Sequence, residues 1–216
     1  MTSTIYEEKY FGAKQPQLND LSSYDREPWY KETVNCLGSF KDKIILDVGC
    51  GAGKAMNLLK GASIFGVDVS KFGTRIACQF GEVIVANAGN LPFKENVFDS
   101  VLMVEVAEHL NDEELGNAFR EVRRVLKKSG IVIIHTQPNG LFGRFFYFFN
   151  RKRLEDTGHV NTLSPFEVRH LLLKYNFIVK RFEVKDFIIL KHLERRNTPT
   201  IVKWVLGNRI LAVAKK

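Results

Sequence analysis

The stretch Ile45-Leu-Asp-Val-Gly-Cys-Gly-Ala-Gly53 decides the fold of this chain of 216 residues. Its first residues are largely apolar, as expected of a strand that is buried on both faces of a sheet. Three alternate glycines follow, and a helical pattern comes after them. Glycine lets the backbone turn sharply and lets a ligand approach main-chain N–H groups. The stretch therefore predicts a ligand-binding loop between a buried strand and a helix.

Short apolar and β-branched segments recur along the chain, and helical patterns lie between them. The segments that predict strands are 43–48, 62–67, 82–86, 99–104, 130–136, 177–184 and 208–214. The patterns that predict helices are 53–60, 70–79, 111–127 and 164–175. Because strands and helices alternate in the early part, the sequence predicts an α/β fold with a parallel, doubly wound sheet.

One helix start is marked by its chemistry. Ser164-Pro-Phe-Glu167 places a capping hydroxyl, a proline at the first helical position and a glutamate three residues after the cap. These groups satisfy backbone N–H groups that have no partner within a helix. The sequence therefore predicts that a helix begins directly after Ser164.

The composition is that of an ordinary globular protein, with 45% hydrophobic and 26% charged residues. No apolar run approaches the roughly 20 residues that span a bilayer, and the first residues lack the pattern of a signal peptide. We therefore expect a cytoplasmic protein. Its three cysteines, Cys36, Cys50 and Cys78, have no metal-ligand spacing and are odd in number, so they indicate neither a zinc site nor a disulfide framework.

The net charge of +8 is distributed unevenly. Residues 1–119 contain 11 Lys and Arg against 17 Asp and Glu, whereas residues 120–216 contain 21 against 7. The first part therefore has a net charge of −6 and the second +14. Either basic residues solvate the helices of the second part, or this part meets an anionic partner.

The predicted second strand ends at an acid that suits a nucleoside ligand. Asp68 stands 21 residues after Asp47, where a carboxylate can accept hydrogen bonds from both ribose hydroxyls. The spacing of the glycines excludes a Walker phosphate loop, since only three residues separate Gly49 from Gly53. Asp47, two residues before the first glycine, would repel a pyrophosphate but could attract an ammonium. These features predict a nucleoside with a cationic amino-acid tail.

At these residues the sequence resembles the class I S-adenosylmethionine-dependent methyltransferases, specifically the type-11 group. The similarity covers roughly residues 40–185 and includes Asn87-Ala-Gly-Asn-Leu-Pro-Phe93, which is similar to the family segment that holds the adenine. The resemblance implies a Rossmann-like, doubly wound, seven-stranded, mostly parallel sheet with an antiparallel last strand. It also implies S-adenosyl-L-methionine as cofactor. The residues that it places at the cofactor are Asp47, Gly49, Cys50, Gly51, Gly53, Asp68, Val69, Asn87, Ala88 and Glu105.

The resemblance further predicts a single methyltransferase domain over residues 1–216. Residues 1–42 would form an N-terminal helical cover, residues 43–136 the cofactor-binding half, and residues 137–216 an acceptor-side half with lid insertions. These insertions contain an aromatic run, Leu141-Phe-Gly-Arg-Phe-Phe-Tyr-Phe-Phe149, followed by the basic Arg151-Lys-Arg153. Asn139, just before the run, could line the acceptor site.

Methyl transfer from a sulfonium is an in-line displacement, so the protein mainly aligns the acceptor and excludes water. A base is needed only where the acceptor must lose a proton. His159 is the leading candidate and His109 the second; His135 is a further candidate and Tyr147 a weaker one. Methylation of pyrimidine C5 is excluded, because it requires a cysteine nucleophile beside the acceptor and Cys50 lies in the glycine loop.

We expect no metal ion, but one alternative is open. Glu105, Glu108 and His109 form a Glu-x-x-Glu-His string whose spacing on one helical turn would bring three ligands together, with His159 as a fourth. A metal-dependent subset of the fold, including small-RNA 2′-O-methyltransferases, uses this arrangement. The same string also occurs beside the cofactor in members without a metal.

Three hypotheses for the function remain. The first is a methyltransferase for a small or lipid-like, anionic acceptor enclosed by the aromatic run, with contact to a membrane surface as a further option. The second is an RNA methyltransferase, acting on transfer RNA, that uses the basic second part to bind the phosphate backbone. The third is a non-catalytic protein that binds the cofactor or a partner. In the first two hypotheses, an O, N or C atom of the acceptor receives the methyl group.

Overall fold

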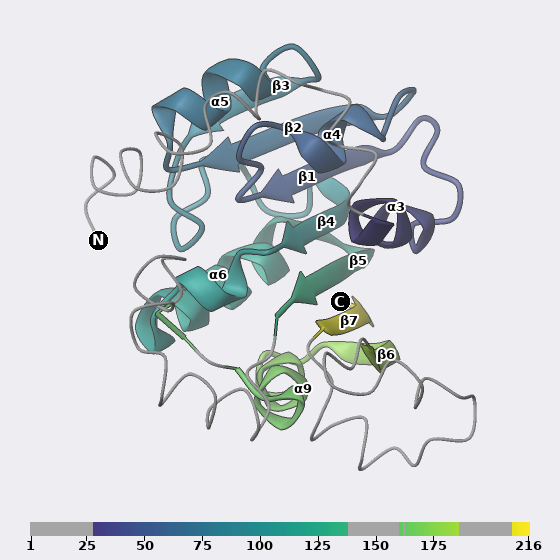
Figure 1. Cartoon of the computed structure of the whole chain (residues 1–216). Coiled ribbons are helices and arrows are strands. Elements are labelled where there is room, and N and C mark those ends of the chain that lie inside the picture. Colours follow the sequence, from purple (N-terminus) through teal and green to yellow (C-terminus); the bar gives the residue numbers. More distant parts are fainter. Residues whose placement is uncertain (1–27, 138–159, 162, 186–208) are drawn as a thin grey trace.

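A computed structural model describes residues 28–137, 160–161, 163–185 and 209–216 (Figure 1). All seven predicted strands are present: β1 (Ile44–Val48), β2 (Ser63–Asp68), β3 (Glu82–Val85), β4 (Phe98–Val104), β5 (Leu126–Thr136), β6 (Ile178–Lys185) and β7 (Arg209–Lys215). The helices are α3 (Pro28–Asn35), α4 (Lys54–Asn57), α5 (Lys71–Ala77), η3 (Ala107–His109), α6 (Asp112–Val125) and α9 (Pro165–Lys174). None of these helices combines the length and the apolar character that a bilayer crossing needs.

The strands form one sheet in the order β3-β2-β1-β4-β5-β7-β6. Strands β1 to β5 pair in parallel, as connections through helices require, whereas β7 is antiparallel to both β5 and β6. The predicted fold class is therefore confirmed: an α/β, Rossmann-like, doubly wound sheet of seven strands with an antiparallel last strand.

Helices cover both faces of the sheet, and strands such as β1, β5 and β7 contribute residues to two separate cores. On one face, Ile45 packs with Met56 of α4 and Val34 near the end of α3. On the other face, Leu46 packs with residues of α6 and α9 such as Phe119 and Leu172. Because both faces of the central strands are covered, these strands read as continuous apolar runs in the sequence.

Two boundaries differ from the sequence prediction by three or more residues. The helix predicted over 53–60 ends at Asn57, because the N–H groups of Leu58 and Leu59 bond three residues back, to Ala55 and Met56, and tighten the turn. The strand predicted over 130–136 begins earlier, at Leu126, which is fully buried and pairs with the first residue of β4. The free energy gained by burying Leu126 outweighs the low strand propensity of the Lys and Ser residues that follow it.

Helix α9 begins as predicted. The Ser164 hydroxyl oxygen accepts from the N–H of Glu167 at 3.2 Å, and the Glu167 carboxylate accepts from the N–H of Ser164 at 2.6 Å. Pro165 occupies the first turn, and Val168 and Leu172 are buried against the sheet and α6. The reciprocal cap fixes the direction in which this helix leaves the loop before it.

We expect Ser164→Ala to lower the free energy of unfolding by about 1 kcal/mol, because it leaves an N–H group of the first turn without its acceptor. Urea unfolding followed by circular dichroism measures this change. Ser164→Thr keeps a hydroxyl and serves as the control with nearly unchanged stability. Equal stability of Ser164→Ala and the parent chain would contradict the assigned cap.

Candidate functional site

The predicted site residues gather at one edge of the sheet. Because β1, β2, β4 and β5 run parallel, their carboxyl ends lie together, and Gly49, Asp68, Glu105 and Gln137 follow or close these strands. Strand β7 runs in the opposite direction, so its first residue, Arg209, reaches the same edge. Ligands of open α/β sheets bind at the carboxyl ends of the strands.

The glycine loop leaves open space over its middle residue. All three glycines have positive φ angles, 71° at Gly49, 50° at Gly51 and 82° at Gly53, which disfavour any residue with a Cβ. A Cβ at Gly49 would lie 2.3 Å from Val106 Cγ2, and one at Gly53 would lie 2.7 Å from Phe80 Cδ2. A Cβ at Gly51 would meet no atom within 4 Å. The backbone at Gly51 is therefore accessible to a ligand, whereas its neighbours pack against the protein.

The Asp68 carboxylate ties this loop to the end of β2. One oxygen accepts from the N–H of Gly51 and the other from the N–H of Ser70, both at 2.8 Å. Val69, which lies between Asp68 and Ser70 in the chain, is an apolar residue with 37% of its surface exposed. An acid at a strand tip beside an exposed apolar side chain suits a sugar and a flat base.

Asp47 and Cys50 lie deeper than the sequence suggested. Asp47 is buried in the sheet, and burial together with the neighbouring Asp68 raises the pKa of its carboxyl to about 8. At neutral pH this acid is mostly uncharged. The Cys50 side chain lies in the core beside Met56, with Gly66 beneath it, so only its backbone faces the loop.

The predicted adenine segment follows β3 at the surface. The Asn87 side chain is exposed, and its Oδ1 accepts from the N–H of Gly89 at 2.7 Å, forming a local turn. Ala88, between these two residues, is half-buried. The N–H of Ala86 donates to the backbone carbonyl of Asp68 at 3.0 Å. This hydrogen bond places the segment beside Asp68, the acid predicted to bind a ribose.

Glu105 lies in a left-handed backbone conformation, with φ at 57°, at the end of β4. The Gln137 amide donates to its carboxylate at 2.6 Å, Arg209 Nη1 donates at 3.3 Å, and His135 Nδ1 lies 3.3 Å away. Burial alone would raise the pKa of Glu105, but these neighbours outweigh it and hold the pKa below its ordinary value. Glu105 therefore keeps a negative charge at the edge of the sheet.

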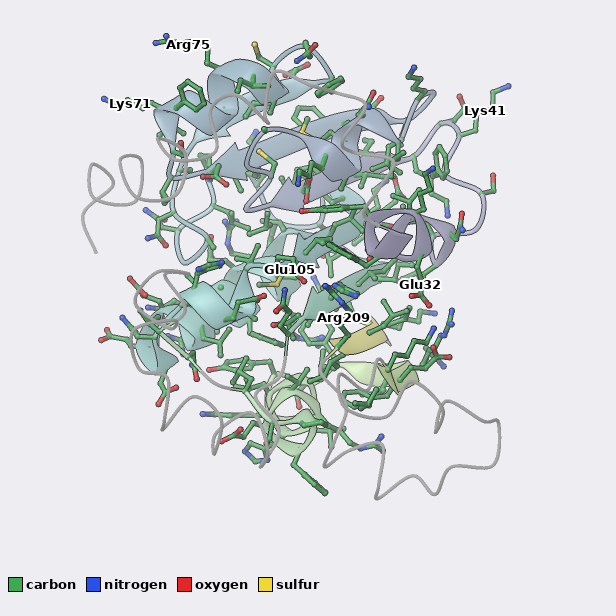
Figure 2. All side chains as sticks on the ribbon, in the orientation of Figure 1. Glu32, Lys41, Lys71, Arg75, Glu105 and Arg209 are labelled. Carbon is green, nitrogen blue, oxygen red and sulfur yellow. The ribbon has the colours of Figure 1, made fainter. Side chains whose placement is uncertain are left out.

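Arg209 connects this charge to the N-terminal helix. Its guanidinium lies 3.8 Å from the centre of the Trp29 ring, a cation–π geometry. It also contacts the Glu105 carboxylate, and Figure 2 labels Arg209 and Glu105. Helix α3, which contains Trp29, is thereby held against β7 and the end of β4. We did not predict Trp29, Gln137 or Arg209 from the sequence. Only Gln137, which follows a predicted strand directly, offered a signal.

Glu108 lies near Glu105, but its carboxyl group is protonated whereas that of Glu105 is ionised. It is fully buried, and burial and the nearby Glu105 charge raise its pKa to about 8. Thr136 Oγ1 donates to it at 2.7 Å, and the N–H of Gln137 donates at 3.4 Å. The two acids are therefore one ionised and one neutral group at pH 7, a separation typical of functional sites.

The predicted metal geometry does not form among the described residues. Glu105, Glu108 and His109 do not share one helical turn, because Glu105 precedes η3 and points to Arg209. Within the described ranges, no three His, Cys, Asp or Glu side chains converge as ligands would. The expectation that no metal ion is used stays a prediction. His159, the fourth ligand of that alternative, lies outside the described residues.

Two of the candidate bases, His109 and His135, lie in the described part of the chain. His109 closes η3 and is half-buried, and His135 is buried behind Glu105. His159, Tyr147, Asn139 and the aromatic run over 141–149 lie outside the described residues.

Comparison with known proteins identifies the family. The family model for the methyltransferase domain matches residues 46–134. Demethylmenaquinone methyltransferase of Thermotoga maritima is 32% identical over 194 residues, which cover 77% of this chain and 84% of that protein. The chain belongs to the class I S-adenosylmethionine-dependent methyltransferases. The enzymes of this family use S-adenosyl-L-methionine as methyl donor, so the match favours a methyltransferase over the non-catalytic alternative.

Other proteins match a smaller part of the chain or only its fold. A tRNA (carboxymethyluridine(34)-5-O)-methyltransferase of Arabidopsis thaliana is 39% identical over 93 residues, 42% of this chain and 23% of that protein. Two uncharacterized proteins of Methanocaldococcus jannaschii match over 40% and 35% of their lengths, so this chain spans less than half of these curated relatives. A chain from the complex of the Haloferax volcanii Trm112 methyltransferase activator has the same fold, with a TM-score of 0.71 at 18% identity, and the match covers 96% of this chain and 97% of that one.

We expect Glu108→Gln to make stability less dependent on pH. The folded chain holds the Glu108 proton up to about pH 8, whereas the unfolded chain releases it near pH ~4. The folded state binds more protons between these values, so the free energy of unfolding falls as pH rises towards 8. Glutamine fits the site, because its oxygen can accept from Gln137 N–H and its amino group can donate to Thr136.

Urea unfolding at several pH values between 6 and 8 tests this. The slope of stability against pH should be shallower in Glu108→Gln by about 1 kcal/mol per pH unit, the value of one proton. Asp47, whose pKa is raised in the same direction, supplies the slope that remains. Glu113→Gln, on the exposed first turn of α6, is the control for loss of a carboxylate. An unchanged slope in Glu108→Gln would show that Glu108 is ionised in the folded chain.

Proposed function

We propose that this enzyme transfers the methyl group of S-adenosylmethionine to a small or lipid-like acceptor that carries negative charge. The observation that supports it best is the match to demethylmenaquinone methyltransferase, which extends over 84% of that protein and whose name gives a quinone as acceptor. The net charge of +14 in residues 120–216 suits an anionic group on the acceptor.

The residues at the carboxyl edge of the sheet fit the cofactor. The open space over Gly51 admits a ligand to the backbone, and Asp68 and Val69 offer an acid for the ribose and an apolar surface for the adenine. The ionised Glu105 lies next to Val106, which packs on Gly49, so a negative charge stands beside the loop. The bound cofactor would supply a methyl group on a positively charged sulfur, and the negative edge favours such a ligand.

In the proposed reaction the protein positions the methyl acceptor, and a histidine removes a proton from the acceptor where this is needed. In-line displacement needs the acceptor atom, the methyl carbon and the sulfur in one line, and a dry site that excludes water as a competing nucleophile. The Trp29–Arg209–Glu105 contacts fix α3 over the end of β4 and so define one wall. We keep His159 as the first candidate base and His109 as the second, acting only if the acceptor loses a proton.

Methylation of transfer RNA is the second candidate. It is favoured by the names of relatives that act on carboxymethyluridine, although the match covers only 23% of the Arabidopsis protein. The basic second part of the chain could bind phosphates, and binding would then weaken steeply with salt. We rank it second because the match to the Arabidopsis protein covers 42% of this chain, against 77% for the match to demethylmenaquinone methyltransferase.

We expect Gly51→Ala to fold but to lose cofactor affinity. The new Cβ enters open space, so its cost is the strain of a positive φ, about 1–2 kcal/mol. It occupies the volume over the loop that the ligand needs, and we expect S-adenosylhomocysteine to bind at least about tenfold more weakly, a loss of about 1.4 kcal/mol. Calorimetry measures the affinity, and urea unfolding measures the stability.

Gly49→Ala is the matched control, because we expect it to affect stability more than Gly51→Ala does. Its Cβ would lie 2.3 Å from Val106 Cγ2, so this variant should lose more stability than Gly51→Ala. If Gly51→Ala bound S-adenosylhomocysteine as tightly as the parent chain, the ligand would not lie over this part of the loop.

The acceptor class is tested by incubating the enzyme with radiolabelled S-adenosylmethionine and separated RNA, lipid and metabolite fractions. We expect label in the lipid or the small-metabolite fraction, with none in RNA. Label confined to RNA would replace the proposed acceptor with the second candidate. Heat-denatured enzyme is the control for spontaneous methylation.

A further inference from the structure

The excess positive charge of the second part of the chain is present in the residues that the structure describes. From residue 120 onwards, the described ranges contain 13 Lys and Arg against 3 Asp and Glu. The cations that form ion pairs are Arg124, Lys127, Arg181, Lys185 and Arg209. The other eight form no ion pair with a described residue. Their positions therefore show where this part of the molecule attracts anions.

Three of these eight cations come together at the amino edge of the sheet, where the parallel strands begin. Strand β5 begins at Leu126, and the antiparallel β7 ends at Lys215, so both reach the edge opposite the glycine loop. Lys128 lies near the start of β5, and Arg123 lies in the last turn of α6, directly before it. Lys216, just after β7, donates through Nζ to the Leu126 carbonyl at 2.6 Å. Two strand ends and a helix end thus bring Arg123, Lys128 and Lys216 to one edge.

The like charges of these three residues act on one another. Burial lowers the pKa of Lys216, and the charges of Arg123 and Lys128 lower it further, whereas the charge of Glu95 opposes them. Lys216 is nevertheless fixed in place, because its Nζ also donates to Asn96 Oδ1 at 2.9 Å. The fold therefore holds like charges together, which costs stability unless an anion meets them.

Arg120 extends this group along α6. It lies three residues before Arg123, and side chains with this spacing are neighbours on the surface of a helix. Its side chain is exposed and donates to the amide oxygen of Asn117, a neutral partner. Arg123 also donates to a neutral group, the Asn176 carbonyl, at 2.9 Å. The basic edge, as we call this group, consists of Arg120, Arg123, Lys128 and Lys216.

The make-up of the basic edge favours a polyanion in water over a lipid bilayer. Helices that lie on a bilayer surface insert apolar side chains in addition to placing cations at the headgroups. Of the seven large hydrophobic residues that are exposed in the described ranges, none belongs to α6, β5 or β7, the elements around this edge. Phosphates of a nucleic acid are neutralised by Lys and Arg alone, and the guanidinium matches their geometry. A flexible single strand can follow cations that come from three different elements.

We propose that the basic edge binds the phosphate backbone of single-stranded RNA. Arg120, Arg123 and Lys128 contact the phosphates, and Lys216, whose ammonium has three acceptors within the protein, contributes its charge. The inference goes beyond the proposed function. Strand β4 spans the sheet from this edge to the cofactor edge with 7 residues, or about 20 Å. RNA held here is thus separated from the residues that fit the cofactor, and it is a binding partner that need not be the methyl acceptor.

The test is fluorescence anisotropy of a fluorescein-labelled RNA of about 20 uridines with the full chain, at salt concentrations from about 50 to about 200 mM. Each phosphate contact with a single strand contributes about 0.7 to the slope of log affinity against log salt concentration. The double variant Arg120→Gln, Lys128→Gln removes two such contacts, so its slope should be shallower by about 1.4. Its affinity should then fall about sevenfold less than that of the parent chain over this rise in salt.

The matched control is the double variant Lys71→Gln, Arg75→Gln. It also removes one Lys and one Arg, both exposed, and Figure 2 labels them on α5. Helix α5 packs against β2 and β3, in the other half of the sheet from β5 and β7. The control should keep the slope of the parent chain. Affinity for S-adenosylhomocysteine, measured for each variant, shows that the fold of the cofactor half is kept.

Three results would overturn the inference. They are no binding of the RNA by the parent chain at about 50 mM salt, equal slopes of the two double variants, and binding of phosphatidylglycerol vesicles or polyglutamate in place of RNA. None of them depends on turnover. Methyl label confined to RNA would refute the proposed acceptor and leave the basic edge standing, whereas absence of RNA binding would leave the proposed acceptor untouched.

Discussion

The two hydrogen bonds of the Asp68 carboxylate are the constraint on which the site depends. They join the N–H of Gly51, in the loop after β1, to the N–H of Ser70, at the start of α5. Ser70 in turn caps α5, since its hydroxyl oxygen accepts from Gly73 N–H at 2.9 Å. One acid thus holds two strand ends and a helix start in register, and the space over Gly51 stays open because the loop cannot collapse onto it.

The second half of the site is built from charges that the fold forces into different states. Glu105 remains ionised among Arg209, His135 and Gln137, whereas Glu108, only three residues on, is buried and neutral at pH 7. The positive φ of Glu105 turns its side chain from the strand towards Arg209, and Trp29 covers the guanidinium. Through these contacts the N-terminal helix and the last strand both meet the end of β4, so segments far apart in sequence form one wall.

The sequence allowed the strands to be predicted because each contains a short run rich in apolar and β-branched residues, and their alternation with helices indicated a parallel, doubly wound sheet. The antiparallel last strand was expected only from the family resemblance. The glycine loop and Asp68 could be predicted because their chemistry is local. Glu105 was found by resemblance, but its partners were not, because Trp29 and Arg209 come together only when β7 inserts antiparallel beside β5. Spacing alone could not show that Glu105 leaves the strand with a positive φ before the helical turn of Glu108 and His109 begins.

The most direct test of the account is calorimetric titration of S-adenosylhomocysteine into the parent chain and Asp68→Asn. The control is Asp99→Asn, since Asp99 also accepts from a backbone N–H, that of Ile44 at 2.9 Å, but at the opposite end of the sheet. A charge-assisted hydrogen bond contributes about 1.5–3 kcal/mol, so the account predicts an affinity at least about tenfold lower for Asp68→Asn and an unchanged affinity for Asp99→Asn. Equal affinity of Asp68→Asn and the parent chain, or no binding by the parent chain, would contradict it.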